Sequence, residues 1–101
     1  MTESNGKELR STMSLRMVLS KMLDGPVYGL RLAKDLGMET ATAYGILARL
    51  EHRNLASSAL EELTREEKSA MGRPARKMYE LTELGEVRAR EMLADKPLPL
   101  G

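Results

Sequence analysis

The chain has 101 residues, which is enough for one hydrophobic core and too few for two. It has no Cys and one His, which argues against a disulfide framework, a thiolate nucleophile and a Cys- or His-ligated metal site, and its net charge of +1 argues neither for nor against nucleic acid as a partner. No apolar run approaches the roughly 18 residues of a membrane span and the N-terminus is polar, so we expect no membrane contact and a cytoplasmic protein.

Residues 1–10 show no periodicity, and we expect a flexible tail there, followed by one domain at 11–95. The first helix of this domain starts after Ser11 or Thr12, either of which can cap it, and follows the sequence MSLRMVLSKML. Its apolar residues recur at helical spacing, with methionines that widen the face: Met13, Leu15, Met17, Val18, Leu19, Met22 and Leu23. Such a width is compatible with a plain core helix and also with a share in a dimer interface.

The segment Asp24-Gly25-Pro26 ends this helix, and VYGLRLAKDLG predicts a second one. Leu32 and Leu36 lie four residues apart in it, and we expect Leu30 and Ala33 to pack beside them. Gly37 stops the second helix about three residues before the next helical pattern begins. This short connection is typical of a helix-turn-helix.

Residues 40–53, TATAYGILARLEHR, have the clearest helical period in the chain, and Thr40 is the expected N-cap. One face is apolar and predicts burial: Ala43, Ile46, Leu47 and Leu50. The opposite face has small side chains at its centre: Ala41, Gly45 and Ala48. Glycine inside a helix costs about 1 kcal/mol relative to alanine, so Gly45 indicates that another molecule approaches this backbone closely. Tyr44, at the flank, can pack its ring on the second helix and donate its hydroxyl to a phosphate.

Two alternating segments, LASSAL and ARKMYELT, then predict the strands of a hairpin, with Tyr79 and Leu81 facing inward. The long polar connection between them can hold a helical turn at LTREEK but buries little. Thr82 caps a last helix that ends near Asp95, and Pro97 and Pro99 mark a disordered tail at 96–101. The expected fold class is therefore mostly α with a small β-hairpin, a winged helix-turn-helix in the order helix, helix, helix, strand, wing, strand, helix.

Charge is distributed unevenly along the wing at 61–76. Its first part is acidic and its end is basic, through Arg73, Arg76 and Lys77. Cations at the junction of a wing and its hairpin can pair with phosphates of a DNA backbone.

Three motifs resemble the PadR-like winged-helix transcriptional regulators of bacteria. They are PVYGLRLAKDL, TATAYGILARLEHRNL and, most specifically, GRPARKMYELTELG, whose residues match the family's Gly-Arg-Pro-x-Arg-Lys-x-Tyr-x-Leu-Thr-x-x-Gly pattern. The resemblance covers about residues 12–90 and implies a repressor. The chain departs from the family pattern at Gly45, where proline is common, and in its C-terminal helix, which is shorter than the family's usual dimerisation segment.

We therefore expect a sequence-specific transcriptional regulator that binds a pseudo-palindromic operator in double-stranded DNA as a homodimer. The predicted DNA-binding residues are Thr40, Ala41, Thr42, Tyr44, Gly45, Arg49, Arg73, Arg76 and Lys77. The predicted dimer interface contains Met13, Met17, Val87 and Met92. The alternative is a winged-helix module that binds another protein through the same surface. No set of catalytic residues or phosphate-binding loop occurs, so we expect neither an enzyme nor a cofactor, and no motif indicates a small-molecule effector.

Overall fold

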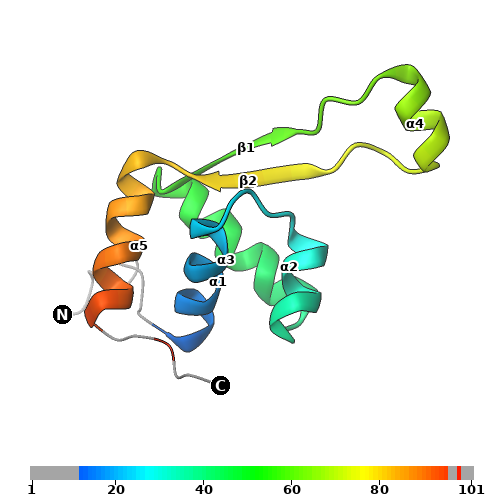
Figure 1. Ribbon diagram of the computed structural model, residues 1–101. Helices are drawn as coiled ribbons and strands as arrows, with labels where there is room; N and C mark the ends of the chain where they lie inside the picture. The colour runs from blue at the N-terminus through cyan, green and yellow to red at the C-terminus, as the bar shows by residue number, and fades with distance from the viewer. Residues whose placement is uncertain (1–11, 96–97, 99–101) are drawn as a thin grey trace.

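The computed structural model describes residues 12–95 and residue 98. The tails predicted at 1–10 and 96–101 therefore lie outside the described residues, except for residue 98. The elements follow the predicted order, with one additional short helix in the wing. They are α1 (Met13–Leu23), α2 (Gly29–Leu36), α3 (Thr40–His52), β1 (Ala56–Leu60), α4 (Arg65–Met71), β2 (Lys77–Leu81) and α5 (Glu83–Asp95). The hairpin crosses over the helices, and its wing carries α4 far out beyond α2 (Figure 1). The winged helix-turn-helix is thus confirmed.

Helix α1 begins at the second of the two predicted caps. The Thr12 hydroxyl accepts a hydrogen bond from the Leu15 amide at 3.1 Å, and this satisfies one of the free N–H groups of the first turn. The apolar stripes of α1 and α3 meet in the core, as predicted. The largest fully buried side chains belong to Leu19, Leu32, Leu47, Leu50 and Val18.

Two local expectations in the helix-turn-helix are wrong. Glu39, not Thr40, is the N-cap of α3, because the Glu39 carbonyl accepts the first helical hydrogen bond, from the Ala43 amide, at 3.1 Å. Thr40 is the first helical residue and is exposed. Leu30 does not pack beside Leu32 and is 61% exposed, because two helical positions turn it about 200° away from that buried residue.

The strands β1 and β2 pair antiparallel, with Ala56 opposite Leu81 and Leu60 opposite Lys77. Tyr79 is buried as predicted, and Leu81 packs against the core. The connection before α2 also joins this sheet: Val27 and Tyr79 exchange two backbone hydrogen bonds of 2.9 and 2.7 Å. The hairpin is therefore fixed to the start of α2 as well as to the core.

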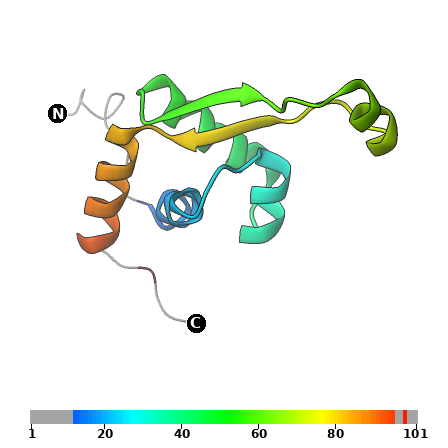
Figure 2. The same ribbon diagram turned by 45° about the horizontal axis from the view of Figure 1, so that its top comes forward.

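Helix α4 is longer than the helical turn predicted in the wing, but it buries no residue. Local sequence accounts for it, because Thr64 and Glu67 form a reciprocal capping box and Gly72 ends the helix in the left-handed conformation. The helix stands at the far end of the wing in both ribbon views (Figures 1 and 2). It forms without tertiary support, and this is consistent with the expectation that the wing connection buries little.

Helix α5 packs alongside α1 (Figure 2). The Thr82 hydroxyl accepts a hydrogen bond from the Gly85 amide at 3.0 Å and donates one to the Asn54 carbonyl at 2.8 Å, which confirms Thr82 as the cap and ties α5 to the end of α3. Asn54, which follows the C-cap Arg53, has a left-handed backbone with φ of 62°. Because α5 covers α1, much of the wide apolar face of α1 is explained by packing within the chain.

None of the helices in the described part of the chain is long and apolar enough to cross a membrane. Within the same residues, no group of three or more His, Cys, Asp or Glu side chains is placed to hold a metal ion.

Candidate nucleic-acid interface

The outer face of α3 is open to solvent along its length. The predicted DNA-binding residues of this helix are all exposed: Thr40, Ala41, Thr42, Tyr44, Gly45 and Arg49. The stripe opposite them is buried, with Ala43, Leu47 and Leu50 fully covered. Nothing lies within 4 Å of the position that a Cβ on Gly45 would take, so no neighbour in the described chain accounts for this glycine. The face can accept a close approach by another molecule.

Tyr44 packs its ring on the second helix, as predicted. A Cβ added to Gly29 would overlap the Tyr44 ring, so the ring lies directly against the backbone at the start of α2. The residue is still 44% exposed. The ring is therefore held by the fold, while part of the side chain remains accessible from solvent. A hydroxyl on such a ring can donate to a phosphate without losing much conformational entropy.

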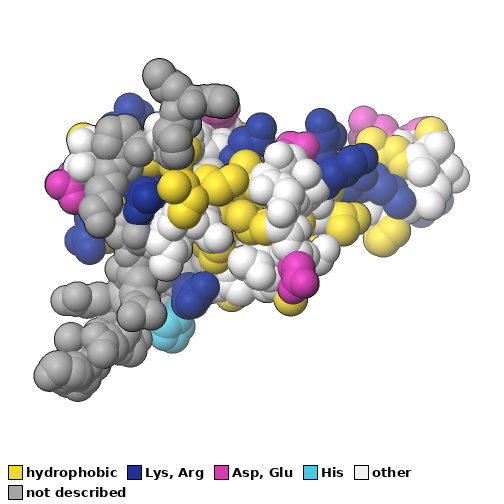
Figure 3. Space-filling view, turned by 90° about the horizontal axis from the view of Figure 1, so that it is seen from below, with side chains coloured by type: hydrophobic (Ala, Val, Ile, Leu, Met, Phe, Trp, Pro, Cys, Tyr) yellow, Lys and Arg dark blue, Asp and Glu magenta, His cyan; other side chains and the backbone are white. Residues whose placement is uncertain are grey.

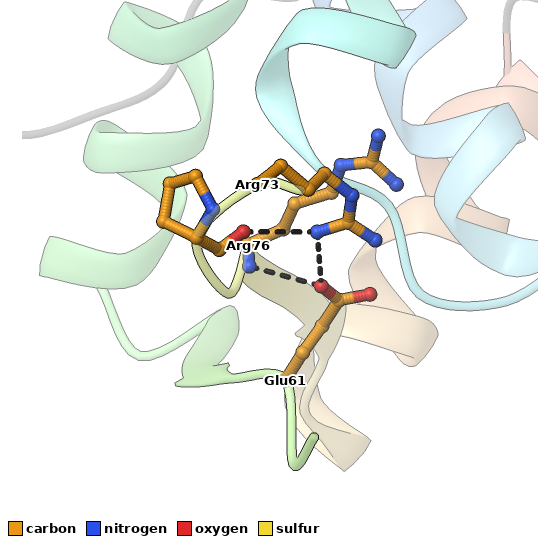
Figure 4. Close-up of polar contacts among 4 residues, drawn as sticks. Glu61, Arg73 and Arg76 are labelled. Atoms are coloured by element: carbon orange, nitrogen blue, oxygen red, sulfur yellow. Dashed lines mark hydrogen bonds and ion pairs between the residues drawn. The ribbon is translucent and has the colours of Figure 1, made fainter. Parts of the chain in front are cut away.

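The base of the wing is held by Glu61 (Figure 4). One carboxylate oxygen, Oε1, accepts from Arg73 Nη1 at 2.8 Å and from the Arg76 amide at 3.0 Å. The Glu61 amide in turn donates to the Arg76 carbonyl at 2.8 Å. The hydrogen bonds from Arg73 and from the Arg76 backbone lower the pKa of Glu61 below its ordinary value. Arg73 is thus engaged inside the wing, and much of its charge is balanced there.

Two further basic residues at the base of the wing, Arg76 and Lys77, lie over aromatic rings. The Arg76 guanidinium carbon is 4.2 Å from the centroid of the Tyr28 ring, and Lys77 Nζ is 5.5 Å from that of Tyr79. Neither contact neutralises the cation.

Lys and Arg side chains gather over the base of the wing in the space-filling view, and toward its far end they are mixed with Asp and Glu side chains (Figure 3). In α4, at that end, Arg65 and Lys68 are balanced by Glu66 and Glu67. The cations at the base of the wing are suited to a phosphate backbone.

The predicted dimer residues are divided between surface and core. Met13 and Val87 are 43% and 52% exposed, and Leu84, one turn before Val87 on α5, is 52% exposed as well. Met17 is half-buried, and Met92 packs against the core cluster. Of the four predicted dimer residues, only Met13 and Val87 are therefore exposed. Leu84 is an exposed apolar residue near Val87 that the prediction did not include.

Two residues of this interface region were missed in the sequence. Glu61 stands 12 residues before Arg73, a separation with no helical or strand period, and its role appears only once the hairpin brings the two ends of the wing together. Tyr28 has its partner Arg76 48 positions away in sequence. The motif PVYGLRLAKDL was the available signal, because the family resemblance singled out this segment without indicating what it contacts.

Solved structures share this fold. A PadR family transcription regulator from Clostridium difficile R20291 superposes with a TM-score of 0.68 at 22% identity, over 83% of this chain and 86% of that one. The adhesin competence repressor AdcR from Streptococcus pyogenes gives 0.67 at 16% identity, over 90% and 61%. The circadian clock associated protein Pex from anabaena gives 0.66 at 19%, over 85% and 76%. The chain spans 61% of AdcR and 53% of ZitR from Lactococcus lactis, so those proteins contain further structure.

The sequence comparisons give one match. Residues 18–91 match the Transcriptional regulator PadR-like family. No curated protein matches the chain. The matched range includes all of α2, α3, the wing and β2.

Proposed function

The chain belongs to the PadR-like family of transcriptional regulators, and from that premise we propose that it is a sequence-specific DNA-binding repressor. In this proposal α3 lies in the major groove and the base of the wing rests on the backbone. The observation that carries it is the exposed face of α3, which has small side chains and an open space at Gly45. A major groove about 12 Å wide admits a helix of this kind.

The proposed readout of bases is sparse. Ala41, Gly45 and Ala48 have no side-chain donor or acceptor, so the centre of the face fits closely and contacts thymine methyl groups. Direct hydrogen bonds to base edges are left to Thr42 and Arg49, and in addition to Thr40, whose hydroxyl is exposed because Glu39 is the cap. So few polar contacts imply moderate specificity, with part of it drawn from the shape of the DNA.

The wing is proposed to position the protein and not to read sequence. Arg76 and Lys77 keep their charge beside aromatic rings, and Arg73 has one Nη group in the bond to Glu61 while its other donors can reach a phosphate. Each phosphate contact contributes to affinity for every sequence alike, and removing one lowers the salt slope by about one unit.

The test uses duplex fragments that the purified protein retains from its own genome. Binding is measured by gel shift at about 0.05 and 0.2 M salt, where DNA binding must weaken as salt rises. Ala41→Glu is expected to abolish binding, because it places an anion and extra bulk in the groove, while a glutamate in the first turn of a helix leaves folding intact. Ala70→Glu, which alters an exposed alanine of α4, a helix that already carries Glu66 and Glu67, is the matched control and should bind normally.

Two results would contradict this proposal. If wild type retains no duplex DNA even at low salt, the alternative of a protein-binding winged-helix module is favoured. If Ala41→Glu is folded by circular dichroism and binds its fragment with unchanged affinity, α3 does not enter the groove.

A further inference from the structure

Tyr28 and Gly29 lie side by side where the wing, α2 and α3 meet. Tyr28 is the N-cap of α2 and follows Val27, whose two backbone hydrogen bonds to Tyr79 join this segment to β2. The Tyr28 ring lies under the guanidinium of Arg76, which comes from the base of the wing. The Gly29 backbone lies against the ring of Tyr44, which comes from α3. Two neighbouring residues thus contact one predicted phosphate ligand from the wing and one from the recognition helix.

We propose that Tyr28 is a positioning residue for DNA binding, which holds the Arg76 guanidinium in place for a phosphate of the backbone before DNA arrives. This inference rests on the proposed function. Tyr28 itself is half-buried.

The contact suits this role because the guanidinium carbon lies 4.2 Å from the ring centroid, and the face of a ring offers no carboxylate or carbonyl oxygen to take up the N–H donors. All five N–H donors of an arginine lie in the guanidinium plane, so a ring that covers the face does not compete with a phosphate for them. An ion pair with a carboxylate, such as the one Arg73 forms with Glu61 at 2.8 Å, does occupy donors and balances charge. A tyrosine ring therefore orders the side chain at little expense to its capacity to bind an anion.

Order in the free protein matters for affinity. An arginine has several freely rotating bonds, and a side chain that is immobilised only on binding reduces affinity through lost rotamer entropy. Arg76 is also anchored at its main chain, where both its amide and its carbonyl bond to Glu61. Tyr28 completes the restriction at the other end of the side chain.

The experiment is a double-mutant cycle on the retained operator fragment, measured by fluorescence anisotropy at about 0.1 M salt. Arg76→Ala should weaken binding by about tenfold, as expected for a charged hydrogen bond. Tyr28→Leu should weaken it by about two- to fivefold, and Tyr28→Phe, which keeps the ring, should stay within about twofold of wild type. If Tyr28 acts through Arg76, the double variant Tyr28→Leu, Arg76→Ala should bind like Arg76→Ala alone, because the losses are not additive.

Independent contributions would instead multiply to a loss of about 20- to 50-fold in the double variant, and that result would overturn the inference while leaving DNA binding established. The absence of any DNA binding by wild type would overturn both proposals together. A second readout does not depend on DNA or on the folding of Tyr28→Leu. In the free wild-type protein, NMR should show the Arg76 Nε–H resonance shifted upfield by the ring relative to that of exposed Arg65, and Tyr28→Phe should keep the shift. An unshifted Arg76 resonance would sink the inference as well.

Discussion

Gly45 lies in the middle of α3 with open space around the position of its missing Cβ. Alanine would fit this space in the protein alone and would favour the helix, so folding gives no reason for glycine here. The reason proposed above lies outside the chain, in the surface of a bound duplex. Stability and binding should therefore respond to a substitution in opposite directions.

We predict that Gly45→Ala stabilises the free protein by up to about 1 kcal/mol, the difference in helix propensity, and raises its melting temperature by a few degrees. Its affinity for the operator should fall, because the added methyl group meets the DNA. Thermal unfolding followed by circular dichroism and anisotropy titration measure the two effects. A variant that is more stable and binds as tightly as wild type would show that no close approach occurs at this position.

Gly85 provides the contrasting case. A Cβ there would overlap the carbonyl of Leu55, a backbone group held in its place by the hydrogen bond to the Thr82 amide at 3.0 Å. We predict that Gly85→Ala destabilises the protein by about 1–3 kcal/mol, as overpacking does, and lowers the melting temperature in the same unfolding experiment. An unchanged or higher melting temperature would mean that α5 can shift away from Leu55.

At the scale of elements, the wing is held at its base and autonomous at its tip. Glu61 closes the base through Arg73 and the Arg76 amide, whereas α4 depends on its own capping box and buries nothing. Because the folded-state pKa of Glu61 is lowered, its carboxylate stabilises the closed base above the unfolded-state pKa, about 4.3. That contribution is lost as the pH falls through the lower, folded-state pKa.

We therefore predict that the wing base loosens in acid before the core unfolds. The Arg76 amide resonance should titrate with Glu61, with a midpoint below the ordinary pKa of a glutamate, and hydrogen exchange at that amide should speed up as the carboxylate is protonated. Glu61→Gln should remove the titration, since the amide side chain holds no charge at any pH. Glu62→Gln, at the exposed neighbouring position, is the control and should leave the midpoint unchanged. A midpoint at or above the ordinary glutamate value would contradict the bonding seen here.

Most elements were predictable because their determinants are local. The spacing of Leu15, Val18, Leu19 and Met22 is a property of one helix, and the alternation around Tyr79 is a property of one strand. The N-cap of α3 was predicted one residue too late, at Thr40. The observation that decides between the two neighbours is which carbonyl accepts the first helical hydrogen bond, and this is the Glu39 carbonyl. Leu30 was misplaced because a leucine beside a buried stripe was assumed to join it. Both errors concern the assignment of a single residue within a correctly predicted helix, so they leave the predicted fold unchanged.

At the scale of the whole molecule, the candidate interface was predictable in part. The exposed face of α3 followed from its helical period, because whatever lies opposite a buried stripe is outside. The partners of the wing cations could not be predicted in this way. Glu61 reaches Arg73 only because the hairpin closes, and Tyr28 reaches Arg76 only because Val27 pairs with Tyr79. Long-range contacts of this kind leave no period in the sequence.

Assembly is the last property argued at this scale. In the proposed binding mode a single α3 would contact only a few base pairs, so selective binding would favour a two-fold dimer with two recognition helices. We propose that Leu84 and Val87, exposed apolar residues one turn apart on α5, contribute to this contact, and Met13 of α1 is exposed as well. With two copies related by a two-fold axis, we expect the operator to be a pseudo-palindrome whose half-sites lie about 34 Å apart or a multiple of that.

We predict that the protein sediments as a dimer at tens of micromolar and that Val87→Glu converts it to a monomer, because two symmetry-related carboxylates would then face each other in an apolar contact. Met71→Glu, at an exposed apolar residue of the wing, is the matched control and should leave the dimer intact. The Val87→Glu monomer should bind one half-site weakly and lose the advantage of the second, which a footprint on the retained fragment would show as protection of one half. A monomeric wild type that binds an asymmetric site one to one would contradict the two-fold arrangement, and then the exposed residues of α5 would need another partner.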